Sequence, residues 1–317
     1  MIIMAVEFIN FIQNGVVFSE EEKLLKSLFK NLKKSKKRFL VVRETWIDQN
    51  SFEAEIKNKK FDEVVTLSFM DHPNINYNFL SSYPIHKIGY YKDSQYYYDF
   101  HSHMVLKYLN YENLNIQPEM IKIPFMSLNG KPHLHREKLV KEIIKRQLHL
   151  KNIVSYNSVG SGFKLIADKF DYSTITPSPF DVYSLGNLEN WRAHFLNVVT
   201  ETTFNNEKFF FVTEKTYKPI LGLKPFIIFG QNGNINILDK FKFENYYTDF
   251  IDITDLDLTD YNNQIKFLET LSNKSENYLQ QKYKSLKEKI LYNRQNFFVH
   301  QKQQQRNLKN SIKNIFS

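Results

Sequence analysis

Short apolar runs separated by longer helical or loop stretches constrain the fold of this chain more than any other feature. In the first half they fall at residues 6–12, 39–42, 64–69 and 85–91. A run that is apolar on both faces is typical of a strand buried in a parallel sheet beneath helices. The sequence therefore predicts an α/β fold built on parallel strands.

The second half repeats this alternation of strands and helices. Strands are predicted at residues 123–127, 153–156, 196–200 and 226–229, and helices at 136–148 and 188–195. Residues 111–119 contain Asn, Gln and Pro118 and are typical of a linker. We therefore expect one domain over 1–118, a second over 119–260, and a helical tail over 261–317 that packs across the domains.

Composition favours a folded protein and leaves the nature of its partner open. Hydrophobic residues make up 42% and aromatic residues 15% of the 317 residues, which is enough apolar surface for a core. The net charge of +9 fits an anionic partner such as a nucleotide, a nucleic acid or a lipid headgroup, and it equally fits a surface solvated by lysine. The same alternatives apply to the basic run at 30–38 and to the lysine-rich tail, a candidate for peripheral membrane contact.

The chain contains no cysteine, which excludes disulfides, thiolate metal sites and a cysteine nucleophile and fits a reducing compartment. Residues 1–12 are apolar, but they lack a basic region and are interrupted by Glu7, so we expect a strand and not a signal peptide. No apolar run approaches the ~20 residues of a membrane span. These features predict a soluble cytoplasmic protein, in the host cytoplasm if the chain is viral, without transmembrane contact.

Polar residues directly follow two of the predicted strands in the first half. Glu44 comes after the run at 39–42, and Asp71 comes after the run at 64–69. Ligands of open parallel sheets bind outside the carboxyl ends of the strands, so both carboxylates are candidates for a catalytic general base. The alternative is that each is a helix cap or a turn former.

A helix start between two predicted strands brings an acid and a base together. Thr213 is a good N-cap, which places Glu214 and Lys215 in the first turn, and Gly222 ends the helix. Lys215 can neutralise a diphosphate there, and the acceptor-only carboxylate of Glu214 can hold sugar hydroxyls. Pro219 should kink or shorten this helix. The plainer alternative is a capped helix with an ordinary Glu–Lys ion pair.

Arg136 stands at a strand–loop–helix junction, where a guanidinium can bind two phosphate oxygens, although by spacing alone it equally fits a surface arginine. We assign no metal site. His101 and His103 are two residues apart on a predicted helix and would point in different directions. Asp255 and Asp257 have a metal-binding spacing but lie in an acidic turn.

Two segments resemble a known family. The stretch Phe211-Val-Thr-Glu-Lys215, followed by an apolar helix, Gly222, Pro225 and a strand ending in Gly230, resembles the donor-binding motif of α-1,3-fucosyltransferases and related viral and phage glycosyltransferases. The segment 125–136 is similar to the one that opens the donor domain in the phage-type relatives. The resemblance covers about residues 120–245.

The resemblance implies roles for individual residues. Arg136 would bind the diphosphate, Glu214 the nucleotide-sugar and Lys215 its phosphate. The full set of implied donor-binding residues is Asn129, Arg136, Glu201, Thr202, Phe211, Thr213, Glu214, Lys215 and Lys218. Thr202 stands where the family has Asn, Phe211 where it has Tyr, and the loop between them is longer, so the sugar and the nucleotide are left open.

The resemblance also implies a fold and a reaction. The fold is a GT-B-like pair of Rossmann-like domains facing across a cleft, with the nucleoside-diphosphate-sugar donor in the second domain and no tightly bound cofactor or obligatory metal. The reaction is an inverting transfer of the sugar to a hydroxyl, in a glycan or a hydroxymethylated pyrimidine of DNA. The alternatives are a nonenzymatic nucleic-acid-binding α/β protein and a peripheral membrane enzyme.

Overall fold

The structure is a computed structural model, and it forms two compact units. Residues 1–100 belong with 301–317 in the first unit, and residues 101–300 form the second. The division predicted at residue 118 stays a prediction. The structure describes residues 6–10, 39–43, 62–67, 84–88, 105–106, 109, 111, 114–129, 133–157, 164–166, 185–201, 213–229, 238–239 and 241–316.

The first unit contains a parallel four-stranded sheet, as the apolar runs predict. Its strands are β1 (Val6–Asn10), β2 (Phe39–Arg43), β3 (Glu63–Leu67) and β4 (Ile85–Ile88). Each strand pairs in parallel with the next one in the chain, in the order β1-β2-β3-β4. The order does not reverse within these four strands, so none of the gaps between them is a topological switch point.

The second unit contains a five-stranded sheet. Its strands are β5 (Ile123–Asn129), β6 (Ile153–Asn157), β7 (Lys164–Ile166), β8 (His194–Val199) and β9 (Phe226–Ile228). They lie in the order β7-β6-β5-β8-β9, with β7 antiparallel to β6 and all other pairs parallel. This is a Rossmann-like order in which the chain first moves outward from β5 on one side and then on the other.

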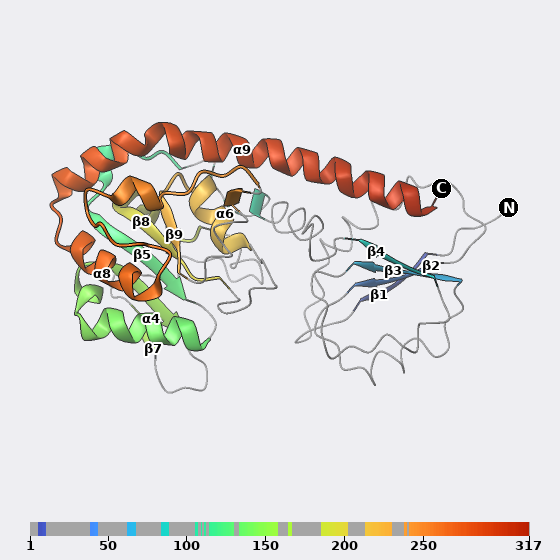
Figure 1. Cartoon of the computed structure of the whole chain (residues 1–317), viewed down its shortest axis with the longest axis horizontal. Helices are drawn as coiled ribbons and strands as arrows, with labels where there is room; N and C mark the ends of the chain where they lie inside the picture. Colours follow the sequence, from blue (N-terminus) through green and yellow to red (C-terminus); the bar gives the residue numbers. More distant parts are fainter. Residues whose placement is uncertain are drawn as a thin grey trace. The chain divides into compact units, whose positions relative to one another are not determined.

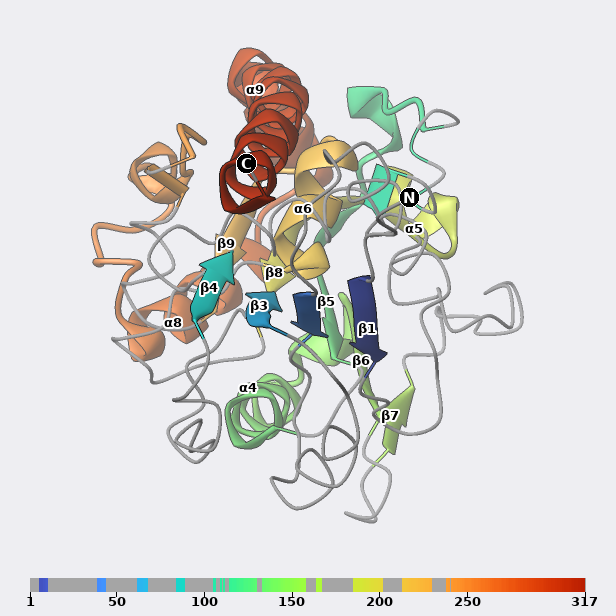
Figure 2. The same cartoon turned by 90° about the vertical axis from the view of Figure 1, so that its right-hand side faces the viewer.

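Helices cover both faces of this sheet, as parallel strands require. Figures 1 and 2 show α4 and α8 on one face and α6 and α9 on the other. Accordingly α4 contacts β6, α8 contacts β5 and α6 contacts β8. The helices are α4 (Leu134–Lys145), α5 (Leu188–Ala193), α6 (Glu214–Leu221), α8 (Tyr261–Ser272) and α9 (Glu276–Phe316), with 3-10 turns at Pro118–Met120, Leu148–Leu150 and Tyr247–Phe250.

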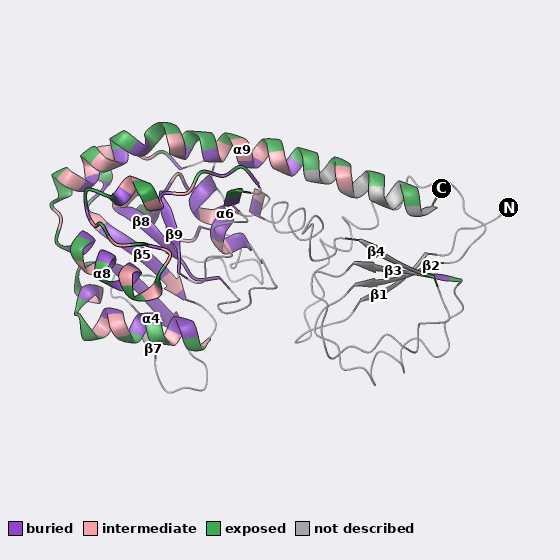
Figure 3. Cartoon of the chain, in the orientation of Figure 1, coloured by how far each residue is buried: buried purple, intermediate pink, exposed green. Residues whose placement is uncertain are grey.

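The core of the second unit lies between the sheet and these helices. All six residues of β8 are buried, as are the three of β9 (Figure 3). The apolar face of α9 packs on this unit through side chains spaced three, four or seven residues apart. These side chains are Leu279, Tyr283, Leu286, Ile290 and Phe297. Across the described residues, none of the helices combines the length and apolar character needed to cross a bilayer.

Three element boundaries differ from the sequence-based expectations. β5 continues to Asn129, two residues beyond the predicted end at residue 127, and Asn129 is still paired there with Tyr156 of β6. α4 begins at Leu134, two residues earlier than predicted, and β8 begins at His194, inside a predicted helix. Pro219 lies inside α6, and the helix ends two residues later at Leu221, which fits the expected shortening.

Candidate functional site

The strand order of the second unit indicates where a ligand would bind. β6 lies on one side of β5 and β8 on the other, so the chain reverses its direction of winding between β5 and β8. Open α/β sheets bind ligands at such a switch point, outside the carboxyl ends of the strands. Asn129 ends β5 at this edge, and Thr200 and Glu201 directly follow β8. We call this side of the five-stranded sheet the carboxyl edge.

Asn129 links three strands through its side chain. Its Nδ2 donates to the Ser155 carbonyl oxygen and to Ser127 Oγ, both at 3.1 Å, and its Oδ1 accepts a hydrogen bond of 2.8 Å from Thr200 Oγ1. The residue is 1% exposed. Both ends of the amide are therefore engaged inside the protein, and they join the carboxyl ends of β5, β6 and β8.

Two side chains from the first turn of α4 hold the chain that leaves β8. Arg136 Nη2 donates to the carbonyl oxygens of Thr200 at 3.0 Å and Glu201 at 3.3 Å. His135 Nε2 lies 2.9 Å from the Glu201 carbonyl oxygen, and because that oxygen can only accept, Nε2 carries the proton. Both side chains are buried.

Burial lowers the pKa of both groups, while the neighbouring charges oppose this lowering for Arg136 and add to it for His135. Burial lowers the pKa of Arg136, while the negative charges of Glu201 and Glu214 oppose the lowering. Burial lowers the pKa of His135 to about 4, and the neighbouring Arg136 and His133 lower it further, against the bond to the Glu201 carbonyl oxygen. His135 is therefore neutral at physiological pH, and Arg136 supplies the positive charge on this side of the site.

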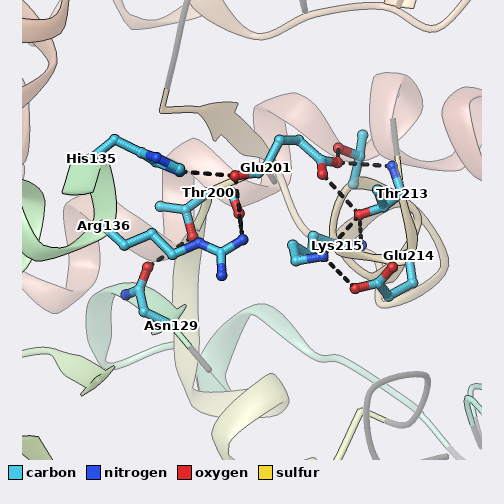
Figure 4. A network of polar contacts seen from close by, with 9 residues as sticks. Asn129, His135, Arg136, Thr200, Glu201, Thr213, Glu214 and Lys215 are labelled. Carbon is cyan, nitrogen blue, oxygen red and sulfur yellow. Dashed lines mark hydrogen bonds and ion pairs between the residues drawn. The ribbon is translucent and has the colours of Figure 1, made fainter. Parts of the chain in front are cut away.

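The carboxylate of Glu201 points the other way, towards the start of α6 (Figure 4). Its Oε1 accepts from the Thr213 backbone N–H at 3.0 Å and from Thr216 Oγ1 at 2.6 Å. Its Oε2 accepts from Thr213 Oγ1 at 2.8 Å. Glu201 is 1% exposed, so this carboxylate is used entirely within the protein.

Thr213 caps α6, as its position before the helix predicts. Its Oγ1 accepts from the Lys215 backbone N–H at 3.3 Å and from Lys215 Nζ at 3.1 Å. Lys215 Nζ also forms an ion pair of 2.5 Å with Glu214 Oε1. The Lys215 side chain is 29% exposed and that of Glu214 only 3%, so Lys215 is the residue of this pair whose side chain is partly accessible.

The start of α6 is therefore already bound to a negative charge of the protein itself, the Glu201 carboxylate. A helix N-terminus attracts negative charge because its first N–H groups lack helical partners. Here the Glu201 carboxylate and the Thr213 hydroxyl accept the N–H groups of Thr213 and Lys215. These two N–H groups are therefore not available to a phosphate group, and Lys215 is the cation at this helix start with a partly exposed side chain.

The structure thus brings together Asn129, Arg136, Glu201, Thr213, Glu214 and Lys215, which come from three separate segments. Lys218 lies one turn further along α6 and is half-buried. The remaining predicted site residues, Glu44, Asp71, Thr202 and Phe211, lie outside the described residues. Their roles stay predictions.

Three residues of this site were missed from the sequence: His135, Thr200 and Thr216. Each acts through a partner that is distant in the chain, as when Thr200 Oγ1 donates to Asn129 Oδ1. A weak signal did exist for Thr216, because a hydroxyl side chain in the first turn of a helix is suited to bond a nearby buried acid, here Glu201.

The opposite side of the sheet, which we call the amino edge, carries a second polar cluster. Lys224 is fully buried, and its Nζ donates to the carbonyl oxygen of His194, the first residue of β8. His194 Nδ1 in turn donates to the Asn190 carbonyl oxygen at 2.7 Å. A lysine inside the apolar run 219–229 was a signal for such burial.

In the described part of the chain, no three histidine, aspartate or glutamate side chains are grouped so that they could hold a metal ion. The comparisons with known proteins add no assignment. At the significance required, no family model, curated protein or solved structure matches the chain. The glycosyltransferase resemblance therefore continues to rest on the residues that carry it.

Proposed function

We propose that the protein is an inverting glycosyltransferase that takes its sugar from a nucleoside-diphosphate sugar bound at the carboxyl edge. The observation that carries the proposal is the convergence of Arg136, Glu214 and Lys215 beside the switch point between β5 and β8. Nothing local in the sequence requires α4 and α6 to start at the same place. Their meeting at this edge is what the donor-site hypothesis needs.

The charges at this edge favour a ligand that carries both phosphates and hydroxyls. Two cations, Arg136 and Lys215, lie near two carboxylates at this edge. One of these carboxylates, that of Glu201, accepts hydrogen bonds from the start of α6, and the other belongs to Glu214. A bare anion would gain from Lys215 but would be repelled by Glu214. A diphosphate sugar can satisfy both, with a phosphate oxygen on Lys215 and a sugar or ribose hydroxyl donating to Glu214.

The proposed reaction needs few groups. A base removes the proton from the acceptor hydroxyl, and the hydroxyl oxygen forms a bond to the anomeric carbon as that carbon's bond to the diphosphate breaks. Lys215, with the positive charge of Arg136 behind it, would stabilise the departing diphosphate. Glu44 and Asp71 stay the predicted bases. We further propose that the first unit supplies the acceptor side, in a GT-B-like arrangement of two Rossmann-like domains.

A thermal-shift screen against ADP, CDP, GDP and UDP tests the donor site first. A ligand at 100 times its Kd stabilises by about 2.7 kcal/mol, which shifts the melting temperature measurably. Transfer or hydrolysis of the corresponding labelled nucleotide-sugar then tests the chemistry. We expect Lys215→Ala to abolish both activities.

Lys141→Ala is a matched control, because it removes a lysine that is 62% exposed and paired with Glu137 on the outer face of α4. The proposal fails if none of the four nucleotides stabilises the protein. It also fails if Lys215→Ala combined with Arg136→Ala transfers sugar at the wild-type rate. Salt-sensitive binding of nucleic acid without any nucleotide binding would support the alternative nonenzymatic function.

A further inference from the structure

We propose that Glu201 is a positioning residue that places the Lys215 ammonium through the hydroxyl of Thr213. This inference rests on the proposed function for its ligand, although its geometry does not. The family resemblance implied that Glu201 contacts the donor. The bonds that this carboxylate makes assign it a different part in the same site.

The first step is that the Glu201 carboxylate is buried and that both of its oxygens already accept hydrogen bonds from the protein. It accepts three hydrogen bonds, from the Thr213 N–H, Thr213 Oγ1 and Thr216 Oγ1, at distances between 2.6 and 3.0 Å. The residue is 1% exposed. A donor substrate would have to break these bonds before it could reach either oxygen.

The second step is that Glu201 orients the Thr213 hydroxyl. A hydroxyl has one proton to donate and two lone pairs that accept. Because Thr213 Oγ1 donates to Glu201 Oε2, its lone pairs are turned towards Lys215, whose N–H and Nζ lie at 3.3 and 3.1 Å. The buried carboxylate thereby fixes the direction in which Thr213 can accept.

The third step is that the Thr213 hydroxyl oxygen, by accepting from Lys215 Nζ, holds the Lys215 ammonium in one position. Lys215 Nζ is bonded on one side to Thr213 Oγ1 and on the other to Glu214 Oε1 at 2.5 Å. A lysine side chain otherwise has considerable rotational freedom, and a ligand would have to supply the free energy of ordering it. A Lys215 that is already ordered binds a phosphate more tightly for that reason.

The backbone of Glu201 extends the same link to α4. Its carbonyl oxygen accepts from His135 Nε2 at 2.9 Å and from Arg136 Nη2 at 3.3 Å. One residue therefore joins the starts of two helices that carry the two cations. The positions of Arg136 and Lys215 are set relative to each other by Glu201.

Glu201→Gln tests the link, because glutamine keeps the shape but replaces one acceptor oxygen by an NH₂ donor. That donor would compete with the Thr213 hydroxyl proton or with Lys215 for the same lone pairs. We expect the variant to bind the nucleoside diphosphate selected by the thermal-shift screen about 10-fold more weakly. Lys141→Ala is the control: it removes an exposed lysine of α4 that lies outside the site, and it should leave affinity within about twofold of wild type.

A double-mutant cycle distinguishes positioning from a general structural effect. If Glu201 acts through Lys215, Glu201→Gln should have almost no further effect in a Lys215→Met background, where affinity is already reduced about 100-fold. Independent effects would multiply to about 1,000-fold, and that result would overturn the inference. Thr213→Ser should retain wild-type affinity, because it keeps the hydroxyl, and Thr213→Val should match Glu201→Gln.

A ligand-free measurement separates failure of this inference from failure of the proposed function. Limited acetylation with N-hydroxysuccinimidyl acetate, read by mass spectrometry, reports how firmly each lysine amine is held. We expect Glu201→Gln to raise the rate at Lys215 several-fold relative to Lys141 in the same molecule, and Thr213→Ser, which keeps the hydroxyl, not to. If no nucleotide binds but this rate rises, the positioning role stands and the donor site falls. An unchanged rate in folded Glu201→Gln overturns the role.

Discussion

Lys215 and Lys224 stand at opposite edges of the same five-stranded sheet, one at each end of α6. Lys215 is 29% exposed and has a carboxylate partner in Glu214. Lys224 is fully buried, and among the described residues no carboxylate forms an ion pair with it; it donates to the His194 carbonyl oxygen and lies 5.3 Å from the centre of the Tyr283 ring. The same residue type is kept available at one edge and enclosed at the other.

Each edge also has a buried histidine bonded to a backbone carbonyl oxygen. His135 donates to Glu201 at the carboxyl edge, and His194 donates to Asn190 at the amino edge. Helix α9 packs on the amino edge. There Gln280 Nε2 donates to the carbonyl oxygen of Ile121, and Tyr283 Oη donates to that of Leu223. The comparison teaches that changes at the amino edge should alter stability, while changes at the carboxyl edge should alter ligand binding.

The largest expected effect is at the amino edge, for Gly222→Ala. A Cβ atom at residue 222 would lie 2.5 Å from Trp191 Cζ3 and 2.7 Å from the Lys218 carbonyl oxygen. Since Trp191 is buried, it has little room to move, and we expect a loss of about 3 kcal/mol in the free energy of unfolding. Urea denaturation measures the loss. Nucleotide affinity should be unchanged in the folded fraction, and a large drop in affinity would break the comparison.

The next effect is a pH dependence that belongs to Lys224. Burial lowers the pKa of Lys224 well below its ordinary value, so between the two values the unfolded chain binds a proton that the folded protein does not. The free energy of unfolding should therefore rise with pH, by up to about 1.4 kcal/mol per unit, until pH reaches about 10. Urea denaturation at pH 7, 8 and 9 should show this rise in wild type and in Lys215→Met. Lys224→Met should lose it, and a slope that persists in this variant would refute the assignment.

The two histidines should make the protein sensitive to acid. The pKa of His135 is lowered from 6.5 to about 4 by burial, and that of fully buried His194 is also lowered. In each case the unfolded chain takes up the proton first, so stability falls as pH drops below about 6.5, by about 2 kcal/mol for His135 between pH 7 and 5.

His135→Gln and His194→Asn are matched substitutions for this test. Each amide nitrogen can take the place of the ring nitrogen that donates, Nε2 in His135 and Nδ1 in His194, and neither can be protonated. Denaturation from pH 7 to 5 should show a shallower loss of stability in both. An unchanged acid dependence in His135→Gln would mean that another group titrates at the carboxyl edge.

The smallest expected effect compares the caps of two helices. Asn187 Oδ1 accepts from the Glu189 N–H at the start of α5, the helix that leads to the amino edge at His194, and Thr213 caps α6. Asn187→Ala should cost about 1 kcal/mol in the free energy of unfolding without a change in nucleotide affinity. Thr213→Ala should cost a similar amount and also weaken nucleotide binding. Calorimetric titration measures the affinities, and equal affinities in the two variants would remove the distinction between the edges.

The elements could be predicted from the sequence because local features determine them. The apolar runs correctly indicated the parallel strands of both units, and Thr213 and Gly222 correctly marked the two ends of α6. The strand order could not be predicted, since it depends on which strands pair across the sheet. The switch point between β5 and β8, and with it the location of the candidate site, became visible with the pairing.

The roles of single side chains were harder to predict, for a related reason. Asn129 precedes a glycine and resembles a turn residue, yet its partners are Ser155 and Thr200, in strands distant in sequence. The apolar run around Lys224 was a signal that this lysine is buried, but its partners, the His194 carbonyl oxygen and the Tyr283 ring of α9, depend on the tertiary fold. Residue type and spacing specify what a side chain can bond, and the tertiary fold decides what it does bond.

The buried and hydrogen-bonded carboxylate of Glu201 limits how this candidate site can be redesigned. At the proposed donor site, replacing Glu201 would remove the hydrogen bonds that its carboxylate accepts from Thr213 and Thr216 at the start of α6. Selectivity for the proposed donor would have to change at Glu214, Lys215 and Lys218, which belong to α6. The start of this helix is held by the hydrogen bonds to Glu201. An engineer who wanted a different donor would therefore randomise those three positions and leave Glu201 alone.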